Sequence, residues 1–243
     1  KWAEKLGVST IGEINDKIVD GSINDIMMMQ EALQEKKIAD IASDIASREE
    51  AKVVLIAGPS SSGKTSFAHR LAIQLMAQGL QAQIISTDNY FVNREESPKD
   101  ENGELNFEAL EAVDIELFND HITKLANGET VEMPEFNFVT GKREFNGKTI
   151  TLTDDSVLII EGIHCLNDKL SYSIPEEKKY RIGVSALTPI NVDEHNRISS
   201  SDLRLLRRIV RDSRTRNISA KTSIERWNKV RLGEEKYIFP FQD

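Results

Sequence analysis

The sequence has little of what several classes of protein require. It contains one cysteine, Cys165, in 243 residues, so no disulfide can form within the chain, and no group of cysteines is present to hold zinc. No apolar run approaches the roughly 18 residues that cross a bilayer, and the opening residues 1–4 lack the apolar core of a signal peptide. These absences predict a soluble protein of a reducing compartment, so we expect it in the cytoplasm and without a membrane partner.

Positive charge is also scarce over most of the chain. The formal net charge is −9, which repels a polyanion, so we expect no nucleic-acid partner. The charge is uneven, because residues 88–120 are strongly acidic whereas residues 197–216 are rich in arginine. Each of these two segments therefore needs its own explanation.

The most specific motif is the run GPSSSGKT from Gly58 to Thr65, a full match to the G-x-x-x-x-G-K-[ST] phosphate-binding loop. The glycines let backbone N–H groups approach phosphate oxygens, and the following helix directs its positive end at them. Lys64 is expected to reach the terminal phosphates of ATP, and Thr65 to hold Mg²⁺. The residues expected to bind ATP are Gly58, Pro59, Ser60, Ser61, Ser62, Gly63, Lys64, Thr65 and Ser66. A chance match in a Ser/Gly turn is the alternative, and the flanking strand and helix patterns argue against it.

Strand and helix patterns alternate from residue 51 onward. Apolar runs predict parallel strands at 53–57, 82–86, 157–160 and 180–186, with the last two buried on both faces. Two alternating stretches between residues 131 and 152 predict a small antiparallel insertion. The fold class is therefore α/β, with a P-loop NTPase-type parallel sheet flanked by helices.

Residues 1–50 predict a helical lead-in packed on the main domain, which spans 51–243. Thr10 and Glu13 have the spacing of a capping box, and Gly21 can end the helix that they begin. A longer helix follows, in which we expect Met27–Met29 to fill the core. Because the chain begins without methionine, we also expect it to be part of a longer polypeptide.

Two carboxylates follow predicted strands, at the sheet edge where open α/β folds bind ligands. Asp88 is placed to accept a proton from a substrate hydroxyl, although an Asp that forms a turn before Asn89 is the plainer alternative. Glu161 follows four apolar residues and is expected to face the Mg²⁺ held by Thr65. A Glu that caps the next turn is the alternative for that position.

Four arginines share one face of a helix that should begin near Ser201. Arg204, Arg207, Arg208 and Arg211 stand at i, i+3, i+4 and i+7, and Leu203, Leu206 and Val210 form an apolar face beside them. Such a row is often a solvated surface. The use of Arg rather than Lys, together with a triphosphate site, favours a lid that closes on phosphates.

Taken together, GPSSSGKT, STDNYF at 86–91, IIEGI at 159–163 and DLRLLRRIVRD at 202–212 resemble the phosphoribulokinase and uridine kinase family of P-loop kinases. The resemblance also covers NFE and AVD at 106–114 and PEFNF at 134–138, which correspond to segments that line the family's acceptor pocket. It implies Asp88 as catalytic base, Lys64 and Thr65 as ligands of phosphate and Mg²⁺, and Arg204 and Arg207 as arginines over the phosphates. It implies Glu108, Phe136 and Arg143 as acceptor-binding residues.

The departures from the family pattern lie on the acceptor side. Glu108 stands where uridine kinases have Asp, Phe136 replaces a Tyr near the base, and Asn137 replaces an Asp. We expect ATP-dependent phosphorylation of a small hydroxyl compound, with the 5′-hydroxyl of a pyrimidine nucleoside first in line. The alternatives are a phosphoribulokinase-like or pantothenate-kinase-like acceptor, or a noncatalytic ATP-binding regulatory module. For the oligomeric state, a homo-oligomer is an alternative to a monomer.

Overall fold

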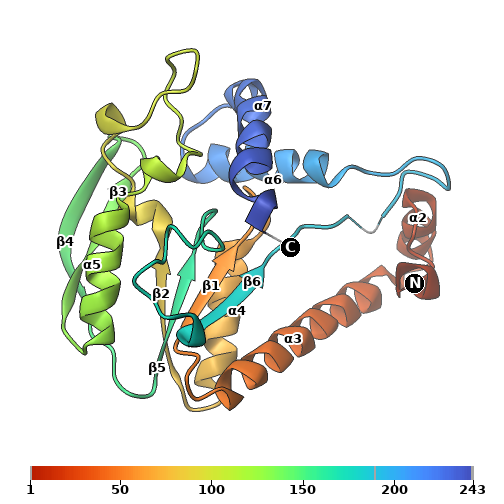
Figure 1. Ribbon diagram of the computed structural model, residues 1–243. Coiled ribbons are helices and arrows are strands. Elements are labelled where there is room, and N and C mark those ends of the chain that lie inside the picture. The colour runs from red at the N-terminus through yellow and green to blue at the C-terminus, as the bar shows by residue number, and fades with distance from the viewer. Residues whose placement is uncertain (1, 189, 242–243) are drawn as a thin grey trace.

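The core of the protein is a parallel sheet of four strands in the order β2-β5-β1-β6, seen in a computed structural model that describes residues 2–188 and 190–241 (Figure 1). Its strands are β1 (Val53–Ala57), β2 (Gln81–Ser86), β5 (Ser156–Glu161) and β6 (Lys179–Gly183). Register pairs Val54 with Ile159 and Ser86 with Glu161. Because all four strands run in one direction, their carboxyl ends share one edge of the sheet, where the site is built.

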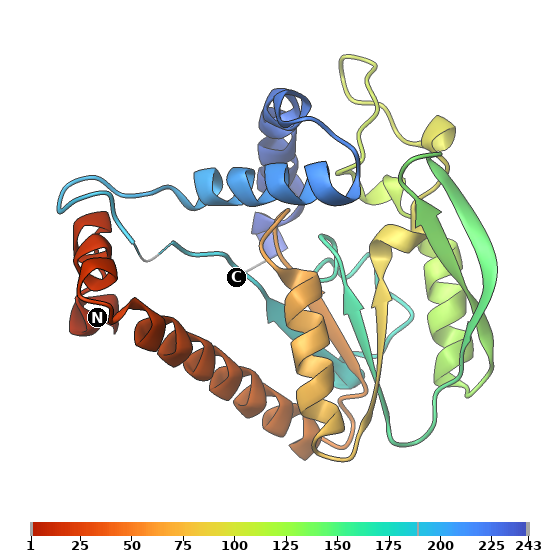
Figure 2. The ribbon, with the colours of Figure 1, turned by 180° about the vertical axis from the view of Figure 1, so that it is seen from behind.

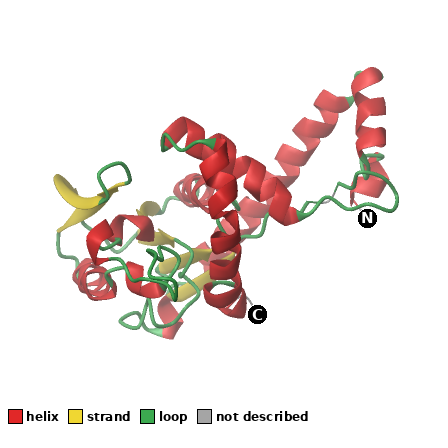
Figure 3. Ribbon diagram, turned by 90° about the horizontal axis from the view of Figure 1, so that it is seen from above, coloured by secondary structure: helices red, strands yellow, loops and turns green. Residues whose placement is uncertain are grey.

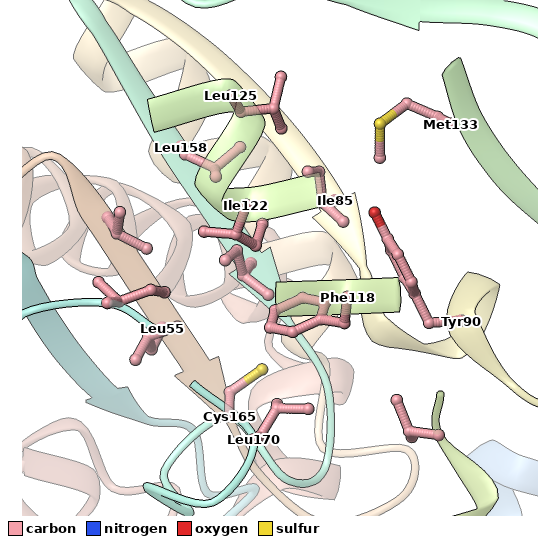
Figure 4. Close-up of a cluster of buried hydrophobic side chains, with 14 of the residues drawn as sticks. Leu55, Ile85, Tyr90, Phe118, Ile122, Leu125, Met133, Leu158, Cys165 and Leu170 are labelled. Carbon is pink, nitrogen blue, oxygen red and sulfur yellow. The ribbon is translucent and has the colours of Figure 1, made fainter. Parts of the chain in front are cut away.

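Side chains alternate between the two faces of the sheet, and each face has its own hydrophobic cluster. On one face, Val54 and Ile56 pack with α4 (Lys64–Met76) and with the end of α3 (Ile23–Ser47). On the other, Leu55, Leu158 and Ile160 pack against α5 (Ile115–Ala126), whose buried side chains include Phe118 and Leu125 (Figure 4). The fold class predicted from the sequence is confirmed.

One of the four predicted strands is less buried than expected. The run 180–186 was predicted to be covered on both faces, but β6 ends at Gly183 and lies at the edge of the sheet, next to β1. Its residues are exposed or half-buried. Tyr180 and Ile182 of β6, with Val184 just after it, are partly buried on the face toward the helices, while Arg181 on the other face pairs with Asp168 and Glu176.

The predicted antiparallel insertion is a two-stranded hairpin of β3 (Val131–Asn137) and β4 (Lys142–Ile150). It lies beside α5, away from the parallel sheet (Figure 1). Arg94 joins the hairpin to the segment after β2, since its backbone N–H donates to Gly141 O over 2.8 Å and its side chain donates to Phe138 O over 2.8 Å. The hairpin is thereby held beside the segment that follows β2.

The N-terminal region is helical, with α1 (Trp2–Leu6) and α2 (Ile11–Val19) preceding α3. The capping box is present: the Thr10 side chain accepts from Glu13 N–H, and Glu13 accepts from Thr10 N–H. Gly21 adopts a φ of 81° directly after the helix. Only the C-terminal half of α3 packs on α4, whereas its first half extends away from the sheet (Figures 2 and 3).

The prediction that Met27–Met29 fill the core is wrong. Their side chains are 41–68% exposed, because they lie on the half of α3 that projects from the domain. The buried residues of this helix are Ile38, Ala42 and Ile45, all in its C-terminal half. Within the described chain, no helix is long and apolar enough to cross a membrane.

Two helices close the fold above the sheet edge that carries the phosphate loop. They are α6 (Ser200–Thr215) and α7 (Ala220–Tyr237), which cross each other over the end of β1 (Figure 1). Ser199 and Ser219 cap them, each with its side chain accepting a backbone N–H of the first turn. The arginine-rich segment therefore faces the phosphate loop as a helix, as predicted.

Candidate active site

The phosphate-loop residues lie between β1 and the first turn of α4, in a backbone path that only small residues allow. Gly63 has a φ of 102°, in the left-handed region, and begins α4. A Cβ on Gly58 would come within 2.2 Å of Val184 O, so the loop could not pass the end of β6 with any other residue there. The side chain of Lys64 lies across this loop, where Nζ donates to Gly58 O over 2.9 Å.

Behind the loop, three oxygen-bearing side chains meet at the ends of α4, β2 and β5. Thr65 Oγ1 donates to Glu161 Oε1 over 3.1 Å, and Ser86 Oγ donates to the same oxygen over 2.9 Å. Glu161 is 5% exposed, and its pKa is raised by burial and then by the nearby Asp88, with Lys64 acting in the opposite direction. A buried carboxylate between two hydroxyls is an all-oxygen set that suits a hard cation such as Mg²⁺.

Asp88 lies in a short 3₁₀ turn, η1 (Thr87–Tyr90), directly after β2. Both ends of this turn are anchored. Thr87 is buried against Gly162, and a Cβ added to Gly162 would lie 1.8 Å from Thr87 Oγ1. At the other end, the Tyr90 hydroxyl lies 3.1 Å from His121 Nδ1. The anchored ends hold the Asp88 carboxylate at the carboxyl edge of the sheet.

Glu108 is brought to the same edge from a separate segment of the chain. Burial raises its pKa to about 7; Arg208 and Lys64 oppose this rise, while Asp88 and Glu234 add to it. The charges that act on Glu108 thus come from the phosphate loop, from η1 and from both closing helices. Lys64 and Asp88 thus lie close enough to Glu108 for their charges to act on its carboxyl.

The other two residues expected on the acceptor side take different positions. Phe136 is 8% exposed in β3, where its ring meets Phe91 and Phe138 edge-on at centroid distances of 5.6 and 5.3 Å. Arg143 in β4 forms an ion pair with Asp114 over 2.9 Å, and Asp114 caps the N-terminus of α5. Phe136 thus belongs to an aromatic group beside the site, and the Arg143 guanidinium is engaged by a structural carboxylate.

The arginine row of α6 faces inward, onto the phosphate loop. Arg208 donates to Ser60 Oγ over 3.0 Å, and a Cβ on Gly63 would lie 3.3 Å from Arg207 Nη2. The leucine side of the helix faces outward, since Leu206 is 62% exposed and Val210 is 49% exposed. The inner surface of α6 is therefore basic, opposite to an ordinary amphipathic helix on a core.

Arg204 differs from its neighbours in this row. It is 3% exposed, and its guanidinium forms a bidentate pair with Glu234 of α7, with Nη2 donating to Oε2 over 2.7 Å and Nη1 to Oε1. Nη1 also donates to Ser60 O over 3.2 Å, and the guanidinium lies 5.4 Å from the centre of the Trp227 ring. Arg204 thus joins α6, α7 and the phosphate loop, whereas Arg207 has its guanidinium at the loop itself.

Sequence reasoning missed Glu234, which is fully buried at the centre of these contacts. Its neighbours Gly233 and Glu235 offer no local motif, and one turn away Arg231 also pairs with it over 2.8 Å. The signal in the sequence is a glycine followed by an acid near the C-terminal end of a helix that otherwise mixes charged and apolar residues. This pattern indicates a buried ion pair only when the partner, Arg204, is already known.

Comparison with known proteins agrees with this arrangement. The sequence model of the Phosphoribulokinase / Uridine kinase family matches residues 53–243, so residues 1–52 lie outside the match. A uridine kinase of Macrococcus caseolyticus is 31% identical over 189 residues, which are 77% of this chain and 82% of the relative. A uridine kinase of Proteus mirabilis is 32% identical over 180 residues, 73% of this chain and 76% of the relative.

A solved structure shares the fold. The putative fructose transport system kinase from a Silicibacter species superimposes with a TM-score of 0.56 at 18% identity, over 83% of this chain and 95% of that chain. At this level of identity the likeness concerns the architecture alone.

Proposed function

The chain belongs to the Phosphoribulokinase / Uridine kinase family and is a P-loop kinase of small molecules, and from this premise we propose that its acceptor is the 5′-hydroxyl of a pyrimidine nucleoside. ATP is the phosphoryl donor in this proposal, and Mg²⁺ accompanies it. The relatives that cover most of the chain are named uridine kinases, which supports a nucleoside as the first candidate.

One observation supports the transfer reaction most directly: Asp88 follows β2 at the carboxyl edge of the sheet, close enough to both carboxylates, Glu161 and Glu108, to affect them. Its charge acts on both Glu161 and Glu108. In the proposed reaction, the Asp88 carboxylate accepts the proton of the acceptor hydroxyl as that oxygen attacks the γ-phosphorus. The bond from the γ-phosphorus to the bridging oxygen breaks, and ADP leaves with the electron pair.

The residues on the triphosphate side neutralise charge during this step. Thr65 and Glu161 would hold Mg²⁺, which spreads the negative charge of the phosphate oxygens when it is bound. Lys64 moves from the loop carbonyls to the terminal phosphates, and Arg207 approaches them from α6. Arg204 acts as a positioning residue in this proposal, because Glu234 and Ser60 already occupy its donors.

The charges around the acceptor side favour a neutral acceptor over a sugar phosphate. Arg143, which could have met a phosphate there, is paired with Asp114, and the carboxyl groups of Asp88 and Glu108 would repel an anion. Phe136 and its aromatic neighbours form an apolar group beside the site, and the partly exposed Phe91 and Phe138 rings offer a nucleobase an apolar contact. A sugar phosphate or pantothenate is the second candidate for the acceptor, and the residues that bind ATP would be the same.

A free, buried Cys165 suits a reducing compartment and the proposed donor is ATP, so we propose a cytoplasmic location. The proposal holds for a monomer as well as for a homo-oligomer, since every residue named in it belongs to one chain.

The test is a panel of acceptors. Uridine, cytidine, ribulose 5-phosphate and pantothenate are each incubated with ATP and Mg²⁺, and ADP release and the phosphorylated product are measured beside the Asp88→Asn variant. We expect turnover with uridine or cytidine and a 5′-monophosphate as product. Turnover with ribulose 5-phosphate or pantothenate alone would replace the nucleoside assignment. Nucleotide binding without turnover of any acceptor would support the noncatalytic regulatory module instead.

A further inference from the structure

Helix α7 presents one row of residues to the acceptor-side segment 100–109. Lys229, Gly233 and Tyr237 stand four residues apart, which places them on one face of the helix. Lys229 pairs with Asp100 over 3.4 Å and also with Glu104. The row is thus in contact with the beginning of the segment that ends in Glu108 and Ala109.

The other end of the row reaches the same segment through His164. The Tyr237 ring lies edge-on to His164 at a centroid distance of 6.0 Å. His164 is 1% exposed and lies against the backbone of Glu108 and Ala109. The acceptor-side segment is therefore held between α7 on one side and the loop after β5 on the other.

Gly233, at the centre of the row, is the residue against which Glu108 lies. A Cβ at position 233 would come within 2.6 Å of Glu108 Cβ and 2.9 Å of its Cγ. These atoms are next to the backbone, so a small rotation of the Glu108 side chain cannot relieve the overlap. A glycine inside a helix weakens the helix relative to alanine, and the close approach of Glu108 explains its presence.

The position of α7 itself is fixed by the next residue. Glu234 is fully buried and pairs with Arg204, which donates to Ser60 O in the phosphate loop. One turn of α7 is thus in contact with the acceptor-side carboxylate through Gly233 and with the phosphate loop through Glu234. Glu108 and the loop are held at a set distance by this turn.

We infer that Gly233 is a specificity-determining residue for the acceptor: it lets α7 pack directly on Glu108, and so sets how far the Glu108 carboxyl extends toward the acceptor. The inference rests on the proposed function for the identity of the acceptor, but not for the contact itself. Gly233 is a positioning residue here, because it acts through Glu108 and does not touch the reacting atoms.

The first experiment is steady-state kinetics of Gly233→Ala beside Leu232→Ala. Leu232 is 58% exposed on the same turn, so its truncation changes the helix without touching Glu108. We expect Gly233→Ala to raise KM for the acceptor by about tenfold or more, with kcat and the Kd for ATP changed less than about threefold. Leu232→Ala should match the wild type. An unchanged acceptor KM in a folded Gly233→Ala variant, or an equal loss of ATP affinity, would overturn the inference.

A double-mutant cycle shows whether the effect acts through Glu108. In a Glu108→Gly background the atoms that meet the new Cβ are gone, so Gly233→Ala should add no further increase in the acceptor KM. An additional increase of the same size as in the wild type would show that Gly233 acts by another route.

A second measurement does not depend on the acceptor at all. Hydrogen exchange of the Asn106 and Glu108 amides, which donate to Pro98 O over 2.8 Å and to Asn106 Oδ1 over 3.1 Å, should be faster in Gly233→Ala and unchanged in Leu232→Ala. If no nucleoside is a substrate but exchange changes in this way, the proposed function fails and the contact stands. If exchange is the same in both variants, the contact does not position the segment, whatever the acceptor.

Discussion

The triphosphate side and the acceptor side of this site are assembled in different ways. The phosphate loop is one continuous segment, and its geometry follows from a glycine with positive φ, a close approach to β6 and a helix N-terminus. The acceptor side joins the segment ending in Glu108, the hairpin β3-β4 and helix α7, which are far apart in the sequence. A contiguous motif can therefore be recognised without a structure, whereas the acceptor side depends on how separate elements pack.

The two sides also differ in how closely they follow known motifs. The triphosphate side matches its motif at every position, whereas Glu108, Phe136 and Asn137 differ from the residues that the resemblance to uridine kinases led us to expect. Phosphates are the same in every kinase of this kind, so the loop that binds them has little freedom to vary. The acceptor side selects the substrate, and changes of single residues there alter specificity.

The largest expected effect tests the triphosphate side alone. Lys64→Ala should lower kcat by about 10³ or more, because the ammonium is the side-chain cation of the loop that can follow the terminal phosphates through the transition state. The fold should be retained, since the hydrogen bonds of Lys64 go to the loop carbonyls of Gly58 and Pro59. Steady-state kinetics with a thermal melt as control checks this. Near-normal turnover in a folded variant would remove the loop from the reaction.

A second prediction distinguishes Arg204 from Arg207, to which the sequence analysis assigned the same role. Arg204→Ala should lower the free energy of unfolding by about 3 kcal/mol or more, because it leaves the buried Glu234 carboxylate without its bidentate partner. The Arg207 side chain is exposed, so Arg207→Ala should lower the free energy of unfolding by at most about 1 kcal/mol. The same substitution should slow phosphoryl transfer. Urea denaturation and kcat are measured for both. Equal losses of stability in the two variants would contradict the different structural roles assigned to Arg204 and Arg207.

Asp88 is where the two sides meet, and its removal should affect turnover without affecting nucleotide binding. We expect Asp88→Asn to lower kcat by about 10², because the amide keeps the shape of the carboxylate but cannot accept the hydroxyl proton. Calorimetry of ATP binding beside kcat gives the comparison. If affinity and turnover fell by the same factor, Asp88 would act on the nucleotide or its metal and not as the base.

The smallest expected effect concerns the acceptor side and pH. The pKa of Glu108 rises from 4.5 to about 7 on folding, so the folded state binds more protons than the unfolded state between these values. Stability therefore falls as pH rises through this window, by about 2–3 kcal/mol between pH 5 and pH 8 from this group. Glu108→Gln should flatten the profile of unfolding free energy between pH 5 and pH 8.

The difference between the wild type and Glu108→Gln removes the contributions of the other titrating groups to the pH dependence of stability. His164, whose pKa is lowered to about 4 by burial, destabilises the fold as pH falls and does so in both proteins. Only the difference between the two profiles reports Glu108. Parallel profiles would show that its carboxyl has an ordinary pKa and is solvated.

Much of the fold could be predicted because its signals are local. The strands around β1 and β5 are short apolar runs, the capping box begins α2, and GPSSSGKT links a strand to a helix. The errors share one cause. Met27–Met29 and the run 180–186 are apolar, but whether an apolar run is covered depends on neighbours that no local pattern specifies.

The candidate site divides in the same way. Position after a strand was enough to select Asp88 and Glu161, since the carboxyl ends of parallel strands share one edge. Spacing was enough to align the arginines of α6, but it could not show which side of the helix faces inward or that Arg204 is held by Glu234. Glu234 and Gly233 were not recognised, because each has its meaning only in a contact with a distant residue.

By itself, then, the sequence determined the phosphate loop, the parallel sheet and the family, because these depend on backbone conformation and hydrophobic periodicity within a few residues. Tertiary structure alone decided that the basic face of α6 lies over the loop while Leu206 and Val210 face outward, and that α7 packs on Glu108. Arg204 and Ser60 are 144 residues apart, and contacts over such separations follow from the packing of whole elements. That packing is a property of the complete chain, which no short stretch of it contains.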